Sequence, residues 1–199
     1  TSGFIAVEYS NVEEFRKVVE ENADKICGFL VEPIQGEAGV NVPEEGYLKA
    51  CFDICQENNI LFIADEIQTG IARTGKMLAI DHENIKPDML ILGKALSGGA
   101  YPVSGVLTRN EVMDVIHPGQ HGSTYGGNPL ACAVAREALQ VVLDEKLAEN
   151  AEKLGQLFRA GINKLVEEFP LFKSVRGKGL LNAILINDTP ESDTAWNFC

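Results

Sequence analysis

Basic side chains and long apolar runs are both scarce in this sequence. Its 199 residues include 17 Lys and Arg against 29 Asp and Glu, which gives a formal net charge of -12 at pH 7. Nucleic acids and anionic membranes bind basic patches, so this balance argues against either partner. No stretch approaches the roughly 20 consecutive apolar residues of a membrane-spanning helix. The opening TSGFIAVEYS lacks the basic start and apolar centre of a signal peptide. We therefore expect a chain that stays inside the cell and has no membrane partner.

Paired cysteines are also missing. The cysteines are odd in number and contain no CxxC pair: Cys27, Cys51, Cys55, Cys132 and Cys199. A chain of this length does not depend on disulfides, so reduced thiols are expected. Cys51 and Cys55 lie one helical turn apart, but no His or second Cys pair follows at the spacing of a zinc site. His117 and His121 are separated by a proline and a glycine, which break any helix that would align them. No metal site is predicted.

Apolar segments that alternate with amphipathic ones dominate the first part of the chain. Hydrophobic residues make up 45% of the sequence, enough for a substantial core. Up to about residue 145 the alternation is typical of βαβ units. The predicted strands are 29–33, 60–64, 89–92 and 103–107, and a helix is predicted at 46–58. Because these strands are apolar on both faces, we expect a mostly parallel sheet covered by helices on both sides.

The pattern changes at Asn128. From there to Pro170 apolar residues recur at helical spacing, with Asn128 as the expected N-cap and Pro129 in the first turn. The next segment, KSVRGKGLLNAILIND, is typical of two strands broken by Gly177 and Gly179. The sequence thus predicts an α/β domain followed by the beginning of a smaller α+β unit. Because that unit does not close and the chain does not start with Met, a piece of a longer protein is expected.

Two ionisable residues follow directly on predicted strands. Asp65 comes after LFIA, and Lys94 comes one glycine after MLIL. Ligand sites of parallel sheets lie beyond the carboxyl ends of the strands. A partly desolvated lysine there can form a Schiff base with a carbonyl, and a facing aspartate can hold the ring nitrogen of pyridoxal phosphate protonated. The alternatives are that Asp65 caps a following helix and that Lys94 is an ordinary surface lysine.

A glycine-rich loop supplies a third candidate element. HPGQHGSTYGGNPL carries the hydroxyls of Ser123 and Thr124 among glycines, directly ahead of a predicted helix. Backbone N–H groups and hydroxyls in such a loop can surround a phosphate. The loop is weak evidence alone, and gains weight beside the lysine and the aspartate.

Five blocks of the sequence together resemble the class III, fold type I, pyridoxal-phosphate aminotransferases. In chain order they are VEPIQGEAGV (31–40), FIADEIQTGIARTG (62–75), LGKALSGGAYPVS (92–104), HGSTYGGNPL (121–130) and VRGKGLLNAI (175–184). The lysine block and the GSTYGGNP loop are highly specific for the class, and the resemblance covers nearly the whole chain. It implies an α/β fold type I large domain over residues 1–145. It also implies a connecting helix and the beginning of the small C-terminal domain over 146–199.

The resemblance further implies roles for single residues around pyridoxal 5'-phosphate. Lys94 is implied to be the Schiff-base lysine that also moves the proton, and Asp65 to pair with the pyridinium nitrogen. Gln68 is implied to hydrogen-bond the phenolic oxygen of the cofactor, and Ile67 to pack on a face of its ring.

Three more residues are assigned in the same way. Ser123 and Thr124 match residues that reach the cofactor phosphate in the partner subunit, which implies a homodimer with a shared site. Glu37 matches a glutamate that pairs with a substrate-binding arginine lying outside this chain. The alternative for Glu37 is a solvated loop carboxylate.

Within the class, the blocks EPIQGEAGV, KALSGGAYPVS and RGKGLLNAI are most similar to ornithine aminotransferases. This implies transfer of the δ-amino group of ornithine to 2-oxoglutarate, giving glutamate semialdehyde and glutamate. Acetylornithine or 4-aminobutyrate as the donor stays open, as does a cofactor-binding or purely structural fragment without catalysis. A cytoplasmic location is expected, with the mitochondrial matrix as the alternative.

Overall fold

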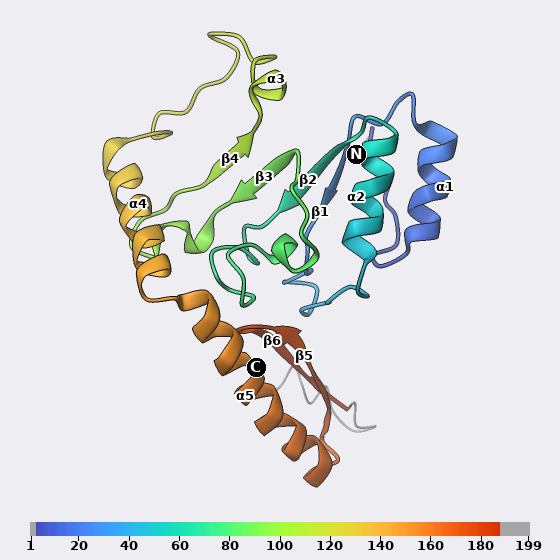
Figure 1. Cartoon of the computed structure of the whole chain (residues 1–199), viewed down its shortest axis with the longest axis vertical. Helices are drawn as coiled ribbons and strands as arrows, with labels where there is room; N and C mark the ends of the chain where they lie inside the picture. The colour runs from blue at the N-terminus through green and yellow to red at the C-terminus, as the bar shows by residue number, and fades with distance from the viewer. Residues whose placement is uncertain (1–2, 188–199) are drawn as a thin grey trace.

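The computed structural model describes residues 3–187, and a four-stranded sheet lies at the centre of their first part (Figure 1). The strand order is β1 (Gly28–Val31), β2 (Leu61–Asp65), β3 (Met89–Leu92) and β4 (Gly105–Thr108). The first three strands are parallel, and β4 is antiparallel to β3. The predicted mostly parallel sheet is confirmed, and each predicted strand ends within two residues of the observed one.

Two helices cover one face of this sheet: α1 (Val12–Asn22) and α2 (Tyr47–Glu57) (Figure 1). α2 begins after Gly46, whose φ of 86° lies in the left-handed region that glycine adopts without steric cost. Between helices and sheet, the fully buried ring of Phe62 lies 5.9 Å from Phe29 and 5.6 Å from Phe52, measured between ring centroids. This aromatic cluster anchors β2, the strand that ends at Asp65.

The opposite face of the sheet is covered only in part by the described residues. Successive side chains of a strand point to opposite faces, and in β1 Phe29 and Val31 are buried whereas Leu30 is 57% exposed. In β4, Val106 is 47% exposed. Within residues 3–187, no helix covers the exposed side chains of Leu30 and Val106. An apolar run shows that a face is suited to burial, but it does not say which segment covers it.

Short helices connect the later strands, and two long helices follow them. The short ones are η1 (Ala79–Glu83), η2 (Lys94–Ser97) and α3 (Asn110–Met113); the long ones are α4 (Pro129–Asp144) and α5 (Leu147–Glu168). The predicted cap of α4 is confirmed, because Asn128 Oδ1 accepts a hydrogen bond from Ala131 N at 2.9 Å and Pro129 stands in the first turn. α4 packs against η2 and so supports the segment that begins with Lys94.

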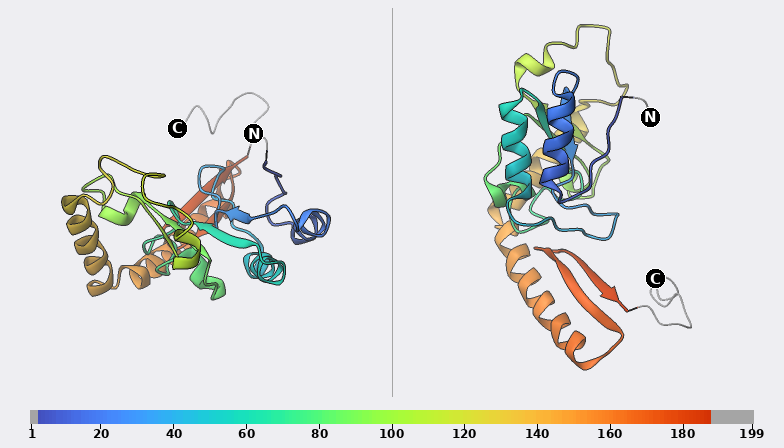
Figure 2. Two further views of the ribbon diagram at one scale, coloured as in Figure 1. Left: turned by 90° about the horizontal axis from the view of Figure 1, so that it is seen from above. Right: turned by 90° about the vertical axis from the view of Figure 1, so that its right-hand side faces the viewer.

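A second, two-stranded sheet packs on α5 (Figure 2). It is the antiparallel hairpin of β5 (Phe172–Lys178) and β6 (Leu181–Ile186), which matches the two strands predicted there. Hydrogen bonds join it to the first part of the chain at two carbonyls. Leu180 N donates to Arg73 O at 3.0 Å, and the Arg176 guanidinium donates to Gly39 O at 2.7 and 3.0 Å. Residues distant in sequence thus fix the hairpin beside the loop that follows β1.

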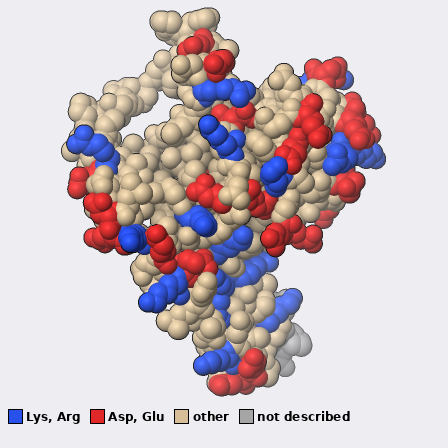
Figure 3. Space-filling view, in the orientation of Figure 1, with Lys and Arg blue, Asp and Glu red and all other residues tan. Residues whose placement is uncertain are grey.

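The surface reflects the acidic composition (Figure 3). Acidic side chains gather over α1 and α2 in this view, and several basic side chains lie across the lower centre of the same face. No helix among residues 3–187 is long and apolar enough to cross a membrane. The thiols of Cys27, Cys51, Cys55 and Cys132 are free, while Cys199 lies outside the described residues. Burial raises the pKa of Cys51 and of Cys55 to about 12.

Candidate active site

Side chains from three loops meet beyond the carboxyl ends of the parallel strands. Glu37 lies in the loop after β1, Gln68 in the turn after β2, and Lys94 two residues after the end of β3. Lys94 Nζ donates a hydrogen bond to Gln68 Oε1 at 2.9 Å and lies 3.9 Å from Glu37 Oε1. The edge of the sheet at which the sequence places a ligand site therefore carries an amine, an amide and a carboxylate within reach of one another.

Lys94 is held in an unusual backbone conformation. Its φ is 41°, in the left-handed region that residues with a Cβ adopt at a steric cost of about 1 kcal/mol or more. Such strain persists only where the surroundings enforce it, and it is concentrated at functional sites. The expected desolvation of this lysine is not observed, because its side chain is 53% exposed.

Asp65, Ile67 and Gln68 share the turn that follows β2. Asp65 Oδ1 accepts a hydrogen bond from Ile67 N at 3.0 Å, and its other carboxylate oxygen has no hydrogen bond to the described residues. The alternative that Asp65 caps a helix is wrong, because the next helical segment is η1 at Ala79. The carboxylate instead shapes a tight turn and keeps one oxygen for another partner.

Ser123 and Thr124 lie apart from this group. They belong to the exposed loop between α3 and α4, which arches away from the sheet at the top of Figure 1. Ser123 Oγ accepts a hydrogen bond from Gly126 N at 3.0 Å. Within residues 3–187, neither hydroxyl contacts Lys94 or Asp65 through a hydrogen bond. One chain therefore does not bring the predicted phosphate-binding residues to its own lysine.

Glu66 is a buried carboxyl beside the site that the sequence interpretation missed. It is 1% exposed, accepts a hydrogen bond from Ile80 N at 2.9 Å and is also hydrogen-bonded to the Thr69 hydroxyl. It therefore fixes η1 against the turn that carries Gln68. The signal was available, because alternation along β2 puts Asp65 on one face and Glu66 on the face of buried Phe62.

Glu66 also makes folding sensitive to pH. Burial raises the pKa of Glu66 above its ordinary value of 4.5. This effect outweighs the hydrogen bonds to the carboxylate, which lower the pKa. The folded state then holds a proton that the unfolded state has released, so this stabilisation is complete below pH 4.5 and is lost as pH rises through the folded pKa. We expect Glu66→Gln, which cannot ionise, to lose less stability than the original protein as pH rises.

Urea midpoints at several pH values would test this expectation, with Glu83→Gln as the control. Glu83 also accepts two backbone N–H groups, from Gly46 at 3.3 Å and Lys49 at 2.7 Å, but it is less buried. Parallel stability–pH curves for Glu66→Gln and the original protein would contradict the assignment.

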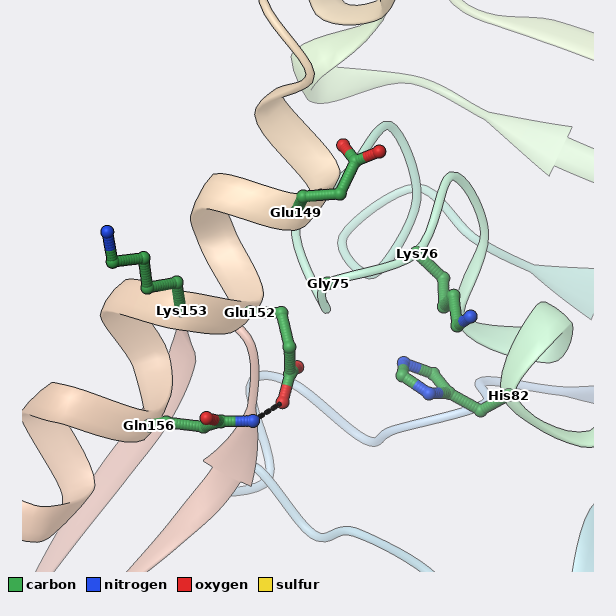
Figure 4. A pocket seen from close by; sticks show the side chains of 7 residues that line it. All are labelled: Gly75, Lys76, His82, Glu149, Glu152, Lys153 and Gln156. Carbon is green, nitrogen blue, oxygen red and sulfur yellow. Dashed lines mark hydrogen bonds between the residues drawn. The ribbon is translucent and has the colours of Figure 1, made fainter.

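A separate cleft lies between the η1 region and α5 (Figure 4). Its volume is about 520 Å³, and its lining is Gly75, Lys76, His82, Glu149, Glu152, Lys153 and Gln156. His82 stands there with a ring nitrogen 3.0 Å from Thr74 O, and burial together with nearby Lys178 lowers its pKa. None of the predicted site residues lines this cleft, so it is distinct from the lysine site.

The chemistry at the strand ends and the arrangement of the fold agree with one family. The family model of aminotransferase class-III matches residues 6–199. The chain belongs to this family. Class-III aminotransferases depend on pyridoxal phosphate and have the fold type I architecture, so the predicted family and fold class are confirmed.

Two relatives of this class-III chain are named after different amino donors. "Ornithine aminotransferase, mitochondrial" of Drosophila ananassae is 55% identical over 99% of the chain and 44% of its own length. A solved structure named acetylornithine aminotransferase, from Elizabethkingia anophelis, is 65% identical with a TM-score of 0.96. The match covers 100% of this chain and 52% of the Elizabethkingia chain. The chain thus spans about half the length of the relatives that it matches.

A third relative is named together with the cofactor. It is an ornithine aminotransferase structure from Toxoplasma gondii, with partial occupancy of PLP at its active site. It is 52% identical to this chain and has a TM-score of 0.91. The match covers 94% of this chain and 44% of the Toxoplasma chain.

The residues at the lysine site fit the ring of this cofactor. Pyridoxal phosphate offers an aldehyde, a ring nitrogen and a phenolic oxygen. Lys94 supplies an accessible amine, and Asp65 has a carboxylate oxygen without a hydrogen bond inside the described chain. Gln68 accepts from Lys94 through Oε1, and its Nε2 donates to no described residue. The three groups thus complement the three ring substituents.

Proposed function

We propose that this chain is the cofactor-binding part of an aminotransferase that moves the δ-amino group of ornithine to 2-oxoglutarate. The proposal rests on one observation: Lys94 Nζ lies 2.9 Å from the Gln68 amide, beside the turn that begins with Asp65, at the carboxyl edge of the sheet. The products are glutamate semialdehyde and glutamate. The names of the Drosophila and Toxoplasma relatives support ornithine as the donor.

Each site residue has a separate task in this proposal. When bound, pyridoxal phosphate supplies an electron sink for the substrate carbon that loses its proton. Lys94 would hold the cofactor through Nζ and would carry the substrate proton on the same nitrogen. Asp65 would keep the ring nitrogen protonated, and Gln68 would donate to the phenolic oxygen. Ile67 would pack on the ring face.

Glu37 is proposed as the substrate residue. Its side chain is 88% exposed and stands 3.9 Å from the lysine amine. A carboxylate in this place attracts a donor with a second positive charge, which ornithine has and N-acetylornithine lacks. N-acetylornithine is the second candidate, because the 65% identical Elizabethkingia structure carries that name.

Assay of the intact protein with pyridoxal phosphate and 2-oxoglutarate would separate the donors. Glutamate formation is measured with ornithine, N-acetylornithine or 4-aminobutyrate. We expect kcat/KM for ornithine to exceed the others by at least about tenfold, because loss of a charged contact costs discrimination of that order. A preference for N-acetylornithine or 4-aminobutyrate would replace the proposed donor. Cofactor absorbance without glutamate from any donor would leave a non-catalytic binding protein, and neither signal would leave a structural role.

A homodimer with a shared site forms part of the proposal. Ser123 and Thr124 are exposed on the loop before α4, which supports a role at the phosphate of a partner subunit rather than at their own lysine. We propose 1–145 as part of the large domain and 146–199 as the connecting helix and the start of the small one. The left-handed Lys146, with φ 51°, supports a boundary between α4 and α5. A cytoplasmic location stays a prediction, and the name of the Drosophila relative supports the mitochondrial alternative.

A further inference from the structure

Gly36 lies directly against the amide of Gln68. It is buried in the loop after β1, next in the chain to Glu37. A methyl group on its Cα would stand 2.5 Å from Gln68 Oε1 and 2.7 Å from Nε2, and it would overlap Cδ. Real Cβ atoms essentially never approach so closely, so the amide occupies space that exists because residue 36 has no side chain.

The backbone of Gly36 is held by three hydrogen bonds. Its N–H donates to Glu32 Oε2 at 3.1 Å, and its carbonyl accepts from the N–H groups of Gly39 and Val40 at 3.0 and 2.9 Å. Its φ lies outside the left-handed region, so alanine can adopt the same conformation. An added methyl would therefore displace the flexible end of Gln68 rather than the loop.

The displaced amide is the one that orients the lysine. Gln68 Oε1 accepts the 2.9 Å hydrogen bond from Lys94 Nζ, and the amide has no other hydrogen bond to the described residues. We propose that Gly36 is a positioning residue: the space at its Cα sets where the Gln68 amide lies and, through it, where the Lys94 amine points. The role in catalysis rests on the proposed function, whereas the placement of the amine can be measured without it.

Reactivity of the lysine in cofactor-free protein tests this inference. The intact protein is acetylated with limiting acetic anhydride, and labelling of Lys94 relative to Lys49 is measured by mass spectrometry. Lys49 is a useful internal reference because it is paired with Asp53 on α2, away from the site. We expect Gly36→Ala to raise the relative labelling of Lys94 about tenfold, the scale of one lost hydrogen bond to a charged group. Gln68→Ala is expected to have the same effect.

The double variant decides between positioning and general damage. In a Gln68→Ala background the methyl has no amide to displace, so Gly36→Ala should change neither labelling nor the melting temperature. Unchanged labelling in Gly36→Ala alone overturns the inference. The inference is also overturned if the effects of Gly36→Ala and Gln68→Ala on Lys94 labelling are additive. It is overturned as well if Gly36→Ala lowers the melting temperature in the Gln68→Ala background, because the methyl group then clashes with the backbone.

Enzyme assays keep the two proposals distinguishable. With the cofactor bound, Gly36→Ala is expected to lower kcat about tenfold and to change its pH profile, again only when Gln68 is present. Amino transfer that survives Lys94→Ala would overturn the proposed function and leave the labelling result valid. If Gly36→Ala changes Lys94 labelling equally with and without the Gln68 amide, the positioning role is overturned, while amino transfer by Lys94 stands.

Discussion

Replacing Lys94 with alanine is expected to lower amino transfer by about 10⁴-fold or more. The substitution removes the only amine within hydrogen-bonding distance of Gln68 among the described residues, and with it both the covalent attachment and the proton carrier. A positioned acid–base group alone contributes about 10² to 10⁴ in rate, and loss of the nucleophile adds to that. Glutamate formation by the intact protein, with saturating cofactor, measures the effect.

The matched control for this substitution is Lys49→Ala. Lys49 is also a half-exposed lysine, paired with Asp53 one helical turn away. Surface pairs of this kind contribute about 1 kcal/mol or less to stability, so activity should stay within a factor of about two. If Lys94→Ala retains more than a hundredth of the original rate, Lys94 does not have the role proposed here.

Asp65→Asn is expected to lower the rate by about 10² to 10³-fold while leaving the fold unchanged. An asparagine oxygen can still accept the 3.0 Å hydrogen bond from Ile67 N, so the turn after β2 is kept. What disappears is the negative charge that holds a proton on the ring nitrogen, and removal of one preorganised electrostatic partner costs a rate factor of this size. Steady-state kinetics should show the loss in kcat rather than in KM for ornithine.

Asp81→Asn is the control for that charge. Asp81 Oδ2 likewise accepts one backbone N–H, from Leu78 at 2.9 Å, but in η1 rather than at a strand end. Equal losses in the two variants would show that the effect reflects the turns and not the ring nitrogen.

The sequence carried the main architecture because its signals are local. Apolar runs located four strands, and the ionisable residues that end two of them placed Asp65 and Lys94 on the correct edge. The Asn128 cap depends on a pattern within a few residues and could equally be predicted. Contacts between residues distant in the sequence have no local pattern that predicts them. Nothing in the motif EPIQGEAG shows that its first glycine faces Gln68, because that contact depends on the pairing of β1 with β2.

Solvent exposure was the other quantity that local patterns did not supply. The run MLIL indicates a buried strand, yet the side chain of Lys94, which follows it, is half-exposed. Leu30 lies in a similar run and faces outward. Burial depends on which segments cover an edge or a face, and this is a property of the assembled molecule. The resemblance of five blocks, and not the periodicity, supplied the roles of Gln68 and Ile67.

The loop that carries Gly36 and Glu37 is tied to the far end of the chain. Arg176 reaches the carbonyl of Gly39 across 137 positions of sequence, and β1, β2 and β3 pair in parallel. Closing such long loops costs chain entropy before the contacts that stabilise them are made, so these contacts form slowly. During synthesis, Glu37 and Gln68 therefore leave the ribosome well before the strand that presents Lys94 exists. The amine and the amide of the lysine site therefore meet only once β3 has paired with β2.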